Sequence, residues 1–153
     1  MTAADFSLFL PLAVLLIWAT VLLILDLFIP KERKGWTASL AALGLALTLF
    51  LSLRQWGESA SGFGKMLHVD PFATFINTLL LLSGLSGVLL AYGSIRRHGV
   101  ERGEYYTLLL FSMGGMMLMA QAGDLILLFL GLELLSIPLY VLAAFALPRL
   151  DSE

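Results

Sequence analysis

The stretch from Asp124 to Leu147 constrains the fold most, because it is a nearly unbroken apolar run: DLILLFLGLELLSIPLYVLAAFAL. As a helix of about 1.5 Å per residue it would span roughly 36 Å, enough to cross a hydrocarbon core of about 30 Å. One carboxylate, Glu133, lies inside the run, about 13–14 Å along such a helix. We therefore expect a membrane-spanning helix with an ionisable group near the middle of the bilayer.

Four further apolar runs precede this one, and short clusters of charged residues separate them. Of the 153 residues, 13% are charged and 59% are hydrophobic, whereas about a quarter of the residues of a soluble domain are charged. We predict one all-α integral membrane domain over residues 1–153, with five transmembrane helices. The expected spans are about 8–29, 36–53, 71–95, 104–122 and 124–147. The Gly- and Ser-rich segment 54–69 is predicted to be an exposed surface connection.

Local sequence features predict how these spans begin and pack. Asp70, followed by proline, and Asp124 are expected to cap the third and fifth helices at their N-termini. The break before Asp124 is short, so the fourth and fifth spans should be antiparallel neighbours. Gly114 and Gly115 leave room for a neighbouring backbone. Asn77 is expected to make a hydrogen bond between helices.

The basic residues predict the orientation in the membrane. With the N-terminus outside, only Arg54 and Lys65 of the nine lysines and arginines would be outside. The inner side would carry Lys31, Arg33, Lys34, Arg96, Arg97, Arg102 and Arg149. This distribution follows the positive-inside rule. It predicts a multi-pass protein with its N-terminus outside and residue 153 in the cytoplasm.

Several classes of function are not expected from this composition. Without cysteine, the chain has no disulfide, no cysteine-ligated iron–sulfur cluster and no thiol nucleophile. His68 and His98 lie outside the apolar runs, so paired haem ligation within the membrane is not expected. There is no basic surface for nucleic acid. Since no nucleophile–base pair, phosphate-binding loop or metal cluster is present, we expect no self-contained active site, and no cofactor or metal bound by this chain.

Glu133 is the strongest candidate for a functional residue. An ionisable group at the bilayer centre costs about 2.5–3.5 kcal/mol on insertion scales and usually has a function. Ser136 and Tyr140 follow Glu133 on the same helical face and are candidates for a proton relay. Pro138 has no N–H for the carbonyl of Leu134, which predicts a kink or an unpaired carbonyl. The alternative is that Glu133 is hydrogen-bonded inside a helix bundle and has only a structural role.

Asp26 is a second carboxylate in an apolar run, three residues before the expected end of the first span. We expect it to lie at the membrane interface, where it could pair with Lys31 or Lys34. The alternative is a role in a proton path.

The sequence from Gly103 to Leu147 resembles subunit N of bacterial respiratory complex I, the proton-translocating NADH:quinone oxidoreductase. The phrase ELLSIPLYVLAAF, residues 133–145, is the most specific part. LLILDLFIP at 22–30 and VDPFATF at 69–75 are similar to the same subunit. Related subunits L and M and cation/proton antiporter subunits typically place an aromatic residue before the glutamate, where this chain has Gly131-Leu132. The resemblance implies the leading part of the complex I and antiporter-like subunit fold.

By this resemblance, Glu133 matches the family's essential glutamate, which pairs with a lysine on a later helix. Quinone reduction elsewhere in the complex would separate such a pair and move a proton. None of Lys31, Lys34 and Lys65 lies inside a predicted span, and family members are several hundred residues long. Since the sequence stops at Glu153, we expect an N-terminal fragment or truncated product without the partner lysines.

The resemblance also implies partners and a location. The expected partners are the other membrane subunits of complex I and the lipid bilayer. NADH, FMN, iron–sulfur clusters and quinone would be bound by other parts of the complex. The expected location is the bacterial inner membrane.

Two other functions remain open from the sequence. The chain could be part of a multi-subunit cation/proton antiporter, which uses the same glutamate without redox coupling. It could also be a non-catalytic membrane scaffold, in which a partner helix satisfies Glu133.

Overall fold

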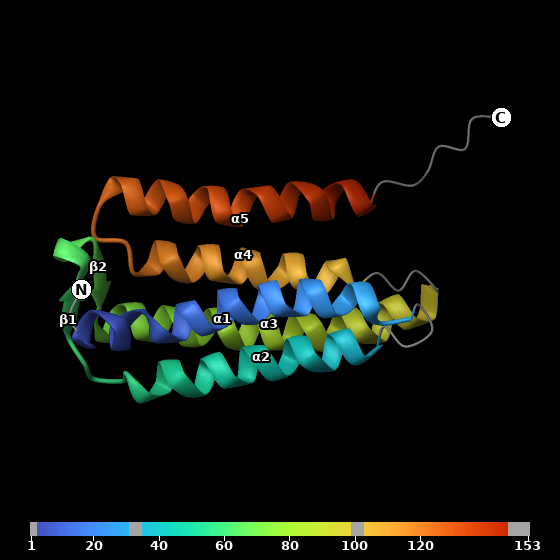
Figure 1. Ribbon diagram of the computed structural model, residues 1–153, viewed down its shortest axis with the longest axis horizontal. Helices are drawn as coiled ribbons and strands as arrows, with labels where there is room; N and C mark the ends of the chain where they lie inside the picture. The colour runs from blue at the N-terminus through green and yellow to red at the C-terminus, as the bar shows by residue number, and fades with distance from the viewer. Residues whose placement is uncertain (1–2, 31–34, 99–102, 147–153) are drawn as a thin grey trace.

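Five α-helices lie side by side in an elongated bundle in the computed structural model, which describes residues 3–30, 35–98 and 103–146 (Figure 1). Their bounds are α1, Ala3–Phe28; α2, Gly35–Arg54; α3, Pro71–His98; α4, Glu104–Ala120; and α5, Leu125–Ala146. Four of them, α1, α2, α3 and α5, are long and apolar enough to cross a membrane. The predicted all-α membrane fold with five helices is thereby confirmed.

The fourth helix differs from the prediction in its length. With 17 residues, α4 is about 26 Å long at about 1.5 Å per residue, slightly less than a hydrocarbon core. It lies inside the bundle, in contact with α1, α2, α3 and α5. In the main core, Leu110 and Met117 of α4 are buried together with Leu15 of α1 and Leu45 of α2.

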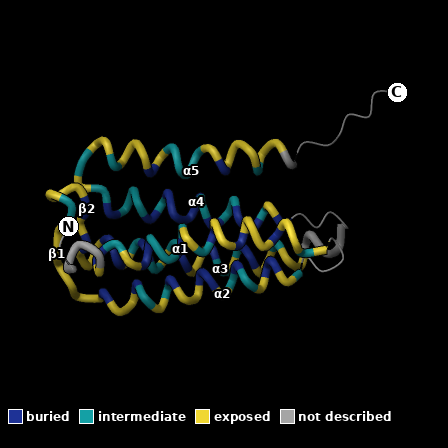
Figure 2. The backbone as a smooth tube through the Cα atoms, viewed as in Figure 1, coloured by how far each residue is buried: buried dark blue, intermediate teal, exposed yellow. Residues whose placement is uncertain are grey.

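α5 lies along one edge of the bundle, and α4 is the element it packs against most (Figure 1). Only 11% of its most apolar stretch is buried, against 33–39% in α1, α2 and α3. Figure 2 shows the same contrast, with exposed and half-buried residues along most of α5. The predicted antiparallel pairing of the fourth and fifth helices is confirmed.

The segment between α2 and α3 was predicted to be an exposed connection, and this prediction is wrong in part. It forms an antiparallel hairpin of β1, Ala60–Gly62, and β2, Leu67–Val69, joined by a short 3-10 turn, η2, Phe63–Lys65. Ala60 pairs with Val69, and Gly62 pairs with Leu67. Leu67 and Val69 are buried in a small cluster with Leu8 of α1. The hairpin therefore covers one end of the bundle, beside the start of α1.

The hairpin also holds the turn that joins α4 to α5. The His68 N–H donates to the carbonyl of Gln121 over 2.8 Å, and the Gly123 N–H donates to the carbonyl of Met66 over 2.7 Å. Gly123 is needed here because a Cβ at this position would collide with the Lys65 carbonyl and the His68 ring. Backbone hydrogen bonds thus fix the place where α5 begins.

The two predicted aspartate caps are confirmed. The Asp70 Oδ1 accepts a hydrogen bond from the Ala73 N–H over 2.6 Å at the start of α3. The Asp124 Oδ1 accepts one from the Leu127 N–H over 2.7 Å at the start of α5. Each carboxylate satisfies an N–H that has no partner within its own helix.

Replacing Asp124 by Ala is expected to lower the free energy of unfolding by about 0.5–2 kcal/mol, because it removes the N-cap of α5. Thermal unfolding of the purified protein in lipid nanodiscs measures this loss. Asp124→Asn is the matched control, since the amide oxygen still accepts the Leu127 N–H bond. An Ala variant as stable as the Asn variant would contradict this assignment.

Candidate functional site

The helix that carries Glu133 approaches α4 closely at two glycines. A Cβ built on Gly115 of α4 would lie 2.5 Å from the backbone nitrogen of Leu135 and 2.7 Å from the carbonyl oxygen of Gly131. A Cβ on Gly131 would in turn lie 3.1 Å from the carbonyl oxygen of Gly115. The backbones of α4 and α5 are therefore in contact at this crossing, as small residues permit. This confirms the expected role of Gly115.

Glu133 lies on the side of α5 turned away from this crossing. At about 100° per residue, two residues separate Glu133 from Gly131 by about 200° around the helix axis. Pro138, seven residues from Gly131, returns to the face of the crossing and is buried. Glu133 itself is half-buried. Within the described residues its carboxylate makes neither a hydrogen bond nor an ion pair, so α4 does not provide its partner.

Ser136 and Tyr140 share the outer face of α5 with Glu133, as the sequence predicted. The Ser136 hydroxyl donates to the carbonyl of Leu132, one turn back in the same helix, over 2.7 Å. Tyr140 is 73% exposed. No hydrogen bond among the described residues joins the three side chains, so their use as a relay stays a prediction.

Pro138 does not interrupt α5, which continues from Leu125 to Ala146 as one helix. Because proline has no N–H, the carbonyl of Leu134 receives no hydrogen bond from this position. That carbonyl lies one residue after Glu133 in the chain. It points along the helix towards Pro138, on the face of the crossing, and therefore away from the Glu133 carboxylate.

Asp26 is buried at the opposite end of the bundle from the hairpin, with 4% of its surface exposed. Its Oδ1 accepts a hydrogen bond from the Thr37 hydroxyl over 2.7 Å. The carboxylate also lies against the Cα of Gly103, where a Cβ would collide with it. Pairing with Lys31 or Lys34 lies outside the described residues.

The position of Asp26 has a simple electrostatic explanation. It lies in the last turn of α1, where the helix dipole disfavours a negative charge. Thr37 is in the first turn of α2, and Gly103 directly precedes α4. The positive N-terminal ends of two helices therefore surround the carboxylate and offset the effect of its own helix. Asp26 thus joins α1, α2 and α4 at one end.

Replacing Asp26 by Ala is expected to lower the free energy of unfolding by about 1–3 kcal/mol, because it leaves the buried Thr37 hydroxyl without its acceptor. Asp26→Asn keeps an acceptor oxygen and should lose less. Guanidinium- or heat-induced unfolding of the two variants in the same detergent gives the comparison. Equal stability of the Ala variant and the unchanged protein would argue against this function of Asp26.

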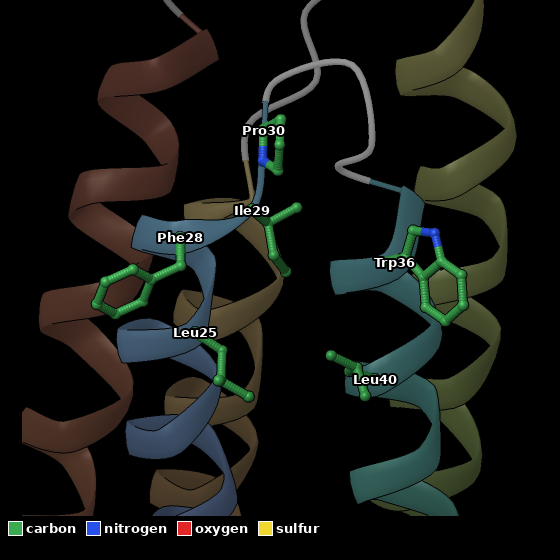
Figure 3. A pocket seen from close by; sticks show the side chains of 6 residues that line it. All are labelled: Leu25, Phe28, Ile29, Pro30, Trp36 and Leu40. Atoms are coloured by element: carbon green, nitrogen blue, oxygen red, sulfur yellow. The ribbon is translucent and has the colours of Figure 1, made fainter.

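An apolar crevice of about 360 Å³ lies between the end of α1 and the start of α2 (Figure 3). Its lining side chains are Leu25, Phe28, Ile29, Pro30, Trp36 and Leu40. None of these can carry a proton, so the crevice is not a candidate for the chemistry expected of Glu133. The described part of the chain also contains no group of three or more His, Asp or Glu residues that could hold a metal ion.

Two residues beside these carboxylates were not recognised as packing residues from the sequence. Gly131 was noted only as a departure from related subunits, although Gly115 on the facing helix already indicated a close crossing. Gly103 directly precedes α4, and no pattern in the sequence relates it to Asp26. That contact depends on how three helix ends meet, which the sequence alone does not specify.

Several curated relatives that share one name match almost the whole chain. NADH-quinone oxidoreductase subunit N from Chloroflexus aggregans is 47% identical over 150 residues, which are 97% of this chain and 31% of the relative. NADH-quinone oxidoreductase subunit N 2 from Roseiflexus castenholzii is 45% identical over 93% of this chain and 28% of the relative. The chain therefore spans less than a third of the length of these proteins. No family model matches it.

A solved structure is similar in fold as well as in sequence. A chain of respiratory complex I from Thermus thermophilus with bound aureothin superposes with a TM-score of 0.74 and 32% sequence identity. The match covers 87% of the present chain and 28% of that chain. The arrangement of helices described above is thus also found in a chain of this respiratory complex.

Proposed function

Because this chain is homologous over nearly all of its length to subunit N of bacterial NADH-quinone oxidoreductases, we propose that it is part of such a proton-translocating subunit. In this proposal, quinone reduction elsewhere in the complex is coupled to proton transfer through Glu133. The homologues support a membrane subunit of NADH:quinone oxidoreductase. The transfer of a proton by Glu133 is our inference from its position.

The observation that carries the proposal is the orientation of Glu133 on α5. The carboxylate lies in the middle of an apolar helix and, within the described bundle, has no hydrogen-bond or ion-pair partner. It is on the side of α5 opposite to Gly131 and α4. A membrane carboxylate in that position is expected to face a cationic partner or a hydrated path. In the proposed subunit this partner is a lysine on a further helix that packs on the outer face of α5.

The proposed mechanism needs only a change in the distance between these two charges. While the lysine is close, it favours the ionised form of Glu133, and when it moves away the carboxylate takes up a proton. When the lysine returns, the proton leaves. Ser136 and Tyr140 lie one and two turns further along the same face and could carry the proton through water.

The same proposal assigns partners, cofactors and orientation. The chain would contact the other membrane subunits of the complex and the lipid bilayer. NADH, FMN, iron–sulfur clusters and quinone would be bound by other parts of the complex. The hairpin end, with Arg54 and Lys65, would face outwards. The other end joins the basic segments 31–34 and 96–102 and would face the cytoplasm.

Purification of the tagged protein from its own membranes tests the assignment to this complex. We expect NADH:quinone oxidoreductase activity to co-purify with the tag. If the protein belonged to an antiporter, the preparation would instead catalyse sodium/proton exchange in vesicles and would not oxidise NADH. That result would overturn the proposal. The scaffold alternative is tested separately, by the Glu133 variant described in the Discussion.

A further inference from the structure

Near the hairpin end of the bundle, three polar side chains are buried although one oxygen atom of each lacks a hydrogen-bond partner among the described residues. Thr74 and Asn77 of α3 are 2% and 1% exposed, and Gln121, which follows α4, is 2% exposed. The Thr74 Oγ1, the Asn77 Oδ1 and the Gln121 Oε1 have no hydrogen-bond partner among the described residues. For Asn77, the sequence predicted a hydrogen bond between helices, which its side-chain oxygen does not make.

The packing of α3 on α4 places these side chains at the same level. A Cβ on Gly84 of α3 would lie 2.9 Å from the Met113 Cε of α4, so the helices touch there. The two helices run in opposite directions (Figure 1). Seven helical residues cover about 10.5 Å. At this distance from the contact towards the hairpin lie Asn77 on α3 and Ala120 on α4, and Gln121 directly follows Ala120. Seven residues are close to two turns, so Asn77 lies on the same face of α3 as Gly84.

The hairpin supports this placement independently. The His68 N–H donates to the Gln121 carbonyl over 2.8 Å, and only Val69 separates His68 from Asp70, the cap of α3. Gln121 is therefore held beside the first turns of α3. Thr74 lies three residues before Asn77, one turn nearer to this end and on the same face.

We propose that Thr74, Asn77 and Gln121 share an ordered internal water molecule that links α3 to the end of α4. Buried polar groups in proteins are almost always hydrogen-bonded, and buried water typically makes about three such bonds to groups without another partner. Two of the three oxygens belong to amides and only accept hydrogen bonds, and a water molecule can donate to both. Its oxygen can accept the remaining bond from the Thr74 hydroxyl.

This site is separate from Glu133 and does not depend on the proposed function. It joins the helices that the hairpin covers, and it offers a hydrogen-bonded connection where the apolar core ends. Gln55, which directly follows α2, adds a polar side chain at the same end, and its Nε2 donates to the carbonyl of Ser7 over 2.9 Å.

The sign of a stability change distinguishes a shared water from three unpaired oxygens. If the oxygens were unpaired, Thr74→Val would remove an unsatisfied polar atom and would raise the unfolding midpoint or leave it unchanged. If they share a water, the same variant deprives the water of one partner, and the midpoint should fall by about 2–4 °C. Thr20→Val on the exposed side of α1 is the matched control and should shift it much less.

Combining Thr74→Val with Asn77→Leu tests whether the groups share one molecule. We expect the double variant to lose less stability than the sum of the two single losses, because the water has already lost its site in either one. Thermal unfolding of the protein in lipid nanodiscs provides these midpoints. Strictly additive losses, or a midpoint that rises in Thr74→Val, would overturn the proposal.

Solid-state NMR of the unchanged protein in a bilayer provides the direct test and needs no variant. With magnetisation transferred from water, we expect early signals from the side-chain amides of Asn77 and Gln121. If these amides were bonded directly to each other, the stability losses of their variants would still be non-additive. The amides would then show no early transfer of magnetisation from water. That outcome would contradict the proposal.

Discussion

Replacement of Glu133 by Gln is expected to abolish proton translocation in a complex that still assembles. Glutamine has nearly the same size and can still form hydrogen bonds, but it cannot take up and release a proton. Glu133 is half-buried and makes no hydrogen bond or ion pair within the described residues, so we expect the exchange to leave the packing of α5 unchanged. The measurement is proton uptake into membrane vesicles during NADH oxidation, with the amount of assembled complex determined on native gels.

Glu58→Gln is the matched control for this variant. Glu58 is exposed in the segment between α2 and β1, so its loss removes the same charge outside the apolar helices. Vesicles with this variant should translocate protons as the unchanged protein does. Full proton translocation by Glu133→Gln would instead support the scaffold alternative, in which the glutamate has only a structural role.

Gly115→Ala is expected to destabilise the protein strongly. The new Cβ would lie 2.5 Å from the Leu135 nitrogen and 2.7 Å from the Gly131 oxygen, both of which are backbone atoms of α5. Since no side chain can rotate away, α4 and α5 must separate. Overpacking of this kind typically costs about 1–3 kcal/mol of stability. We also expect reduced proton translocation, because α5 carries Glu133.

Gly87→Ala on α3 provides a control with the opposite sign. No atom lies within 4 Å of a Cβ built on Gly87. Alanine there should raise stability by about 0.4–1 kcal/mol, because it restricts the unfolded chain without disturbing the helix. Unfolding midpoints of both variants in one lipid mixture make the comparison. If Gly115→Ala also stabilised the protein, the close crossing of α4 and α5 would be wrong.

The sequence predicted the helices well because long apolar runs leave few alternatives to a helix in a membrane. Caps such as Asp70 and Asp124 were predictable because each bonds to a backbone N–H only three residues away. The hairpin was missed, since its strands are three residues each and its pairing with Gln121 and Gly123 depends on distant parts of the chain.

The candidate site was predictable to a similar extent. One carboxylate in an apolar run is visible in the sequence, and helical periodicity places Ser136 and Tyr140 on its face. The direction in which that face points is not visible in the sequence, because it depends on which residues of α5 touch α4. Gly131 fixes this direction through its contact with Gly115. The burial of Asp26 likewise follows from the meeting of three helix ends.

Infrared difference spectroscopy of the purified complex during NADH oxidation tests the claim that the Glu133 carboxylate takes up and releases a proton in each cycle. We expect a carboxyl band that changes on addition of NADH, shifts with ¹³C-labelled glutamate and is absent from Glu133→Gln. An unchanged difference spectrum in that variant would show that Glu133 keeps one protonation state, which would contradict the claim.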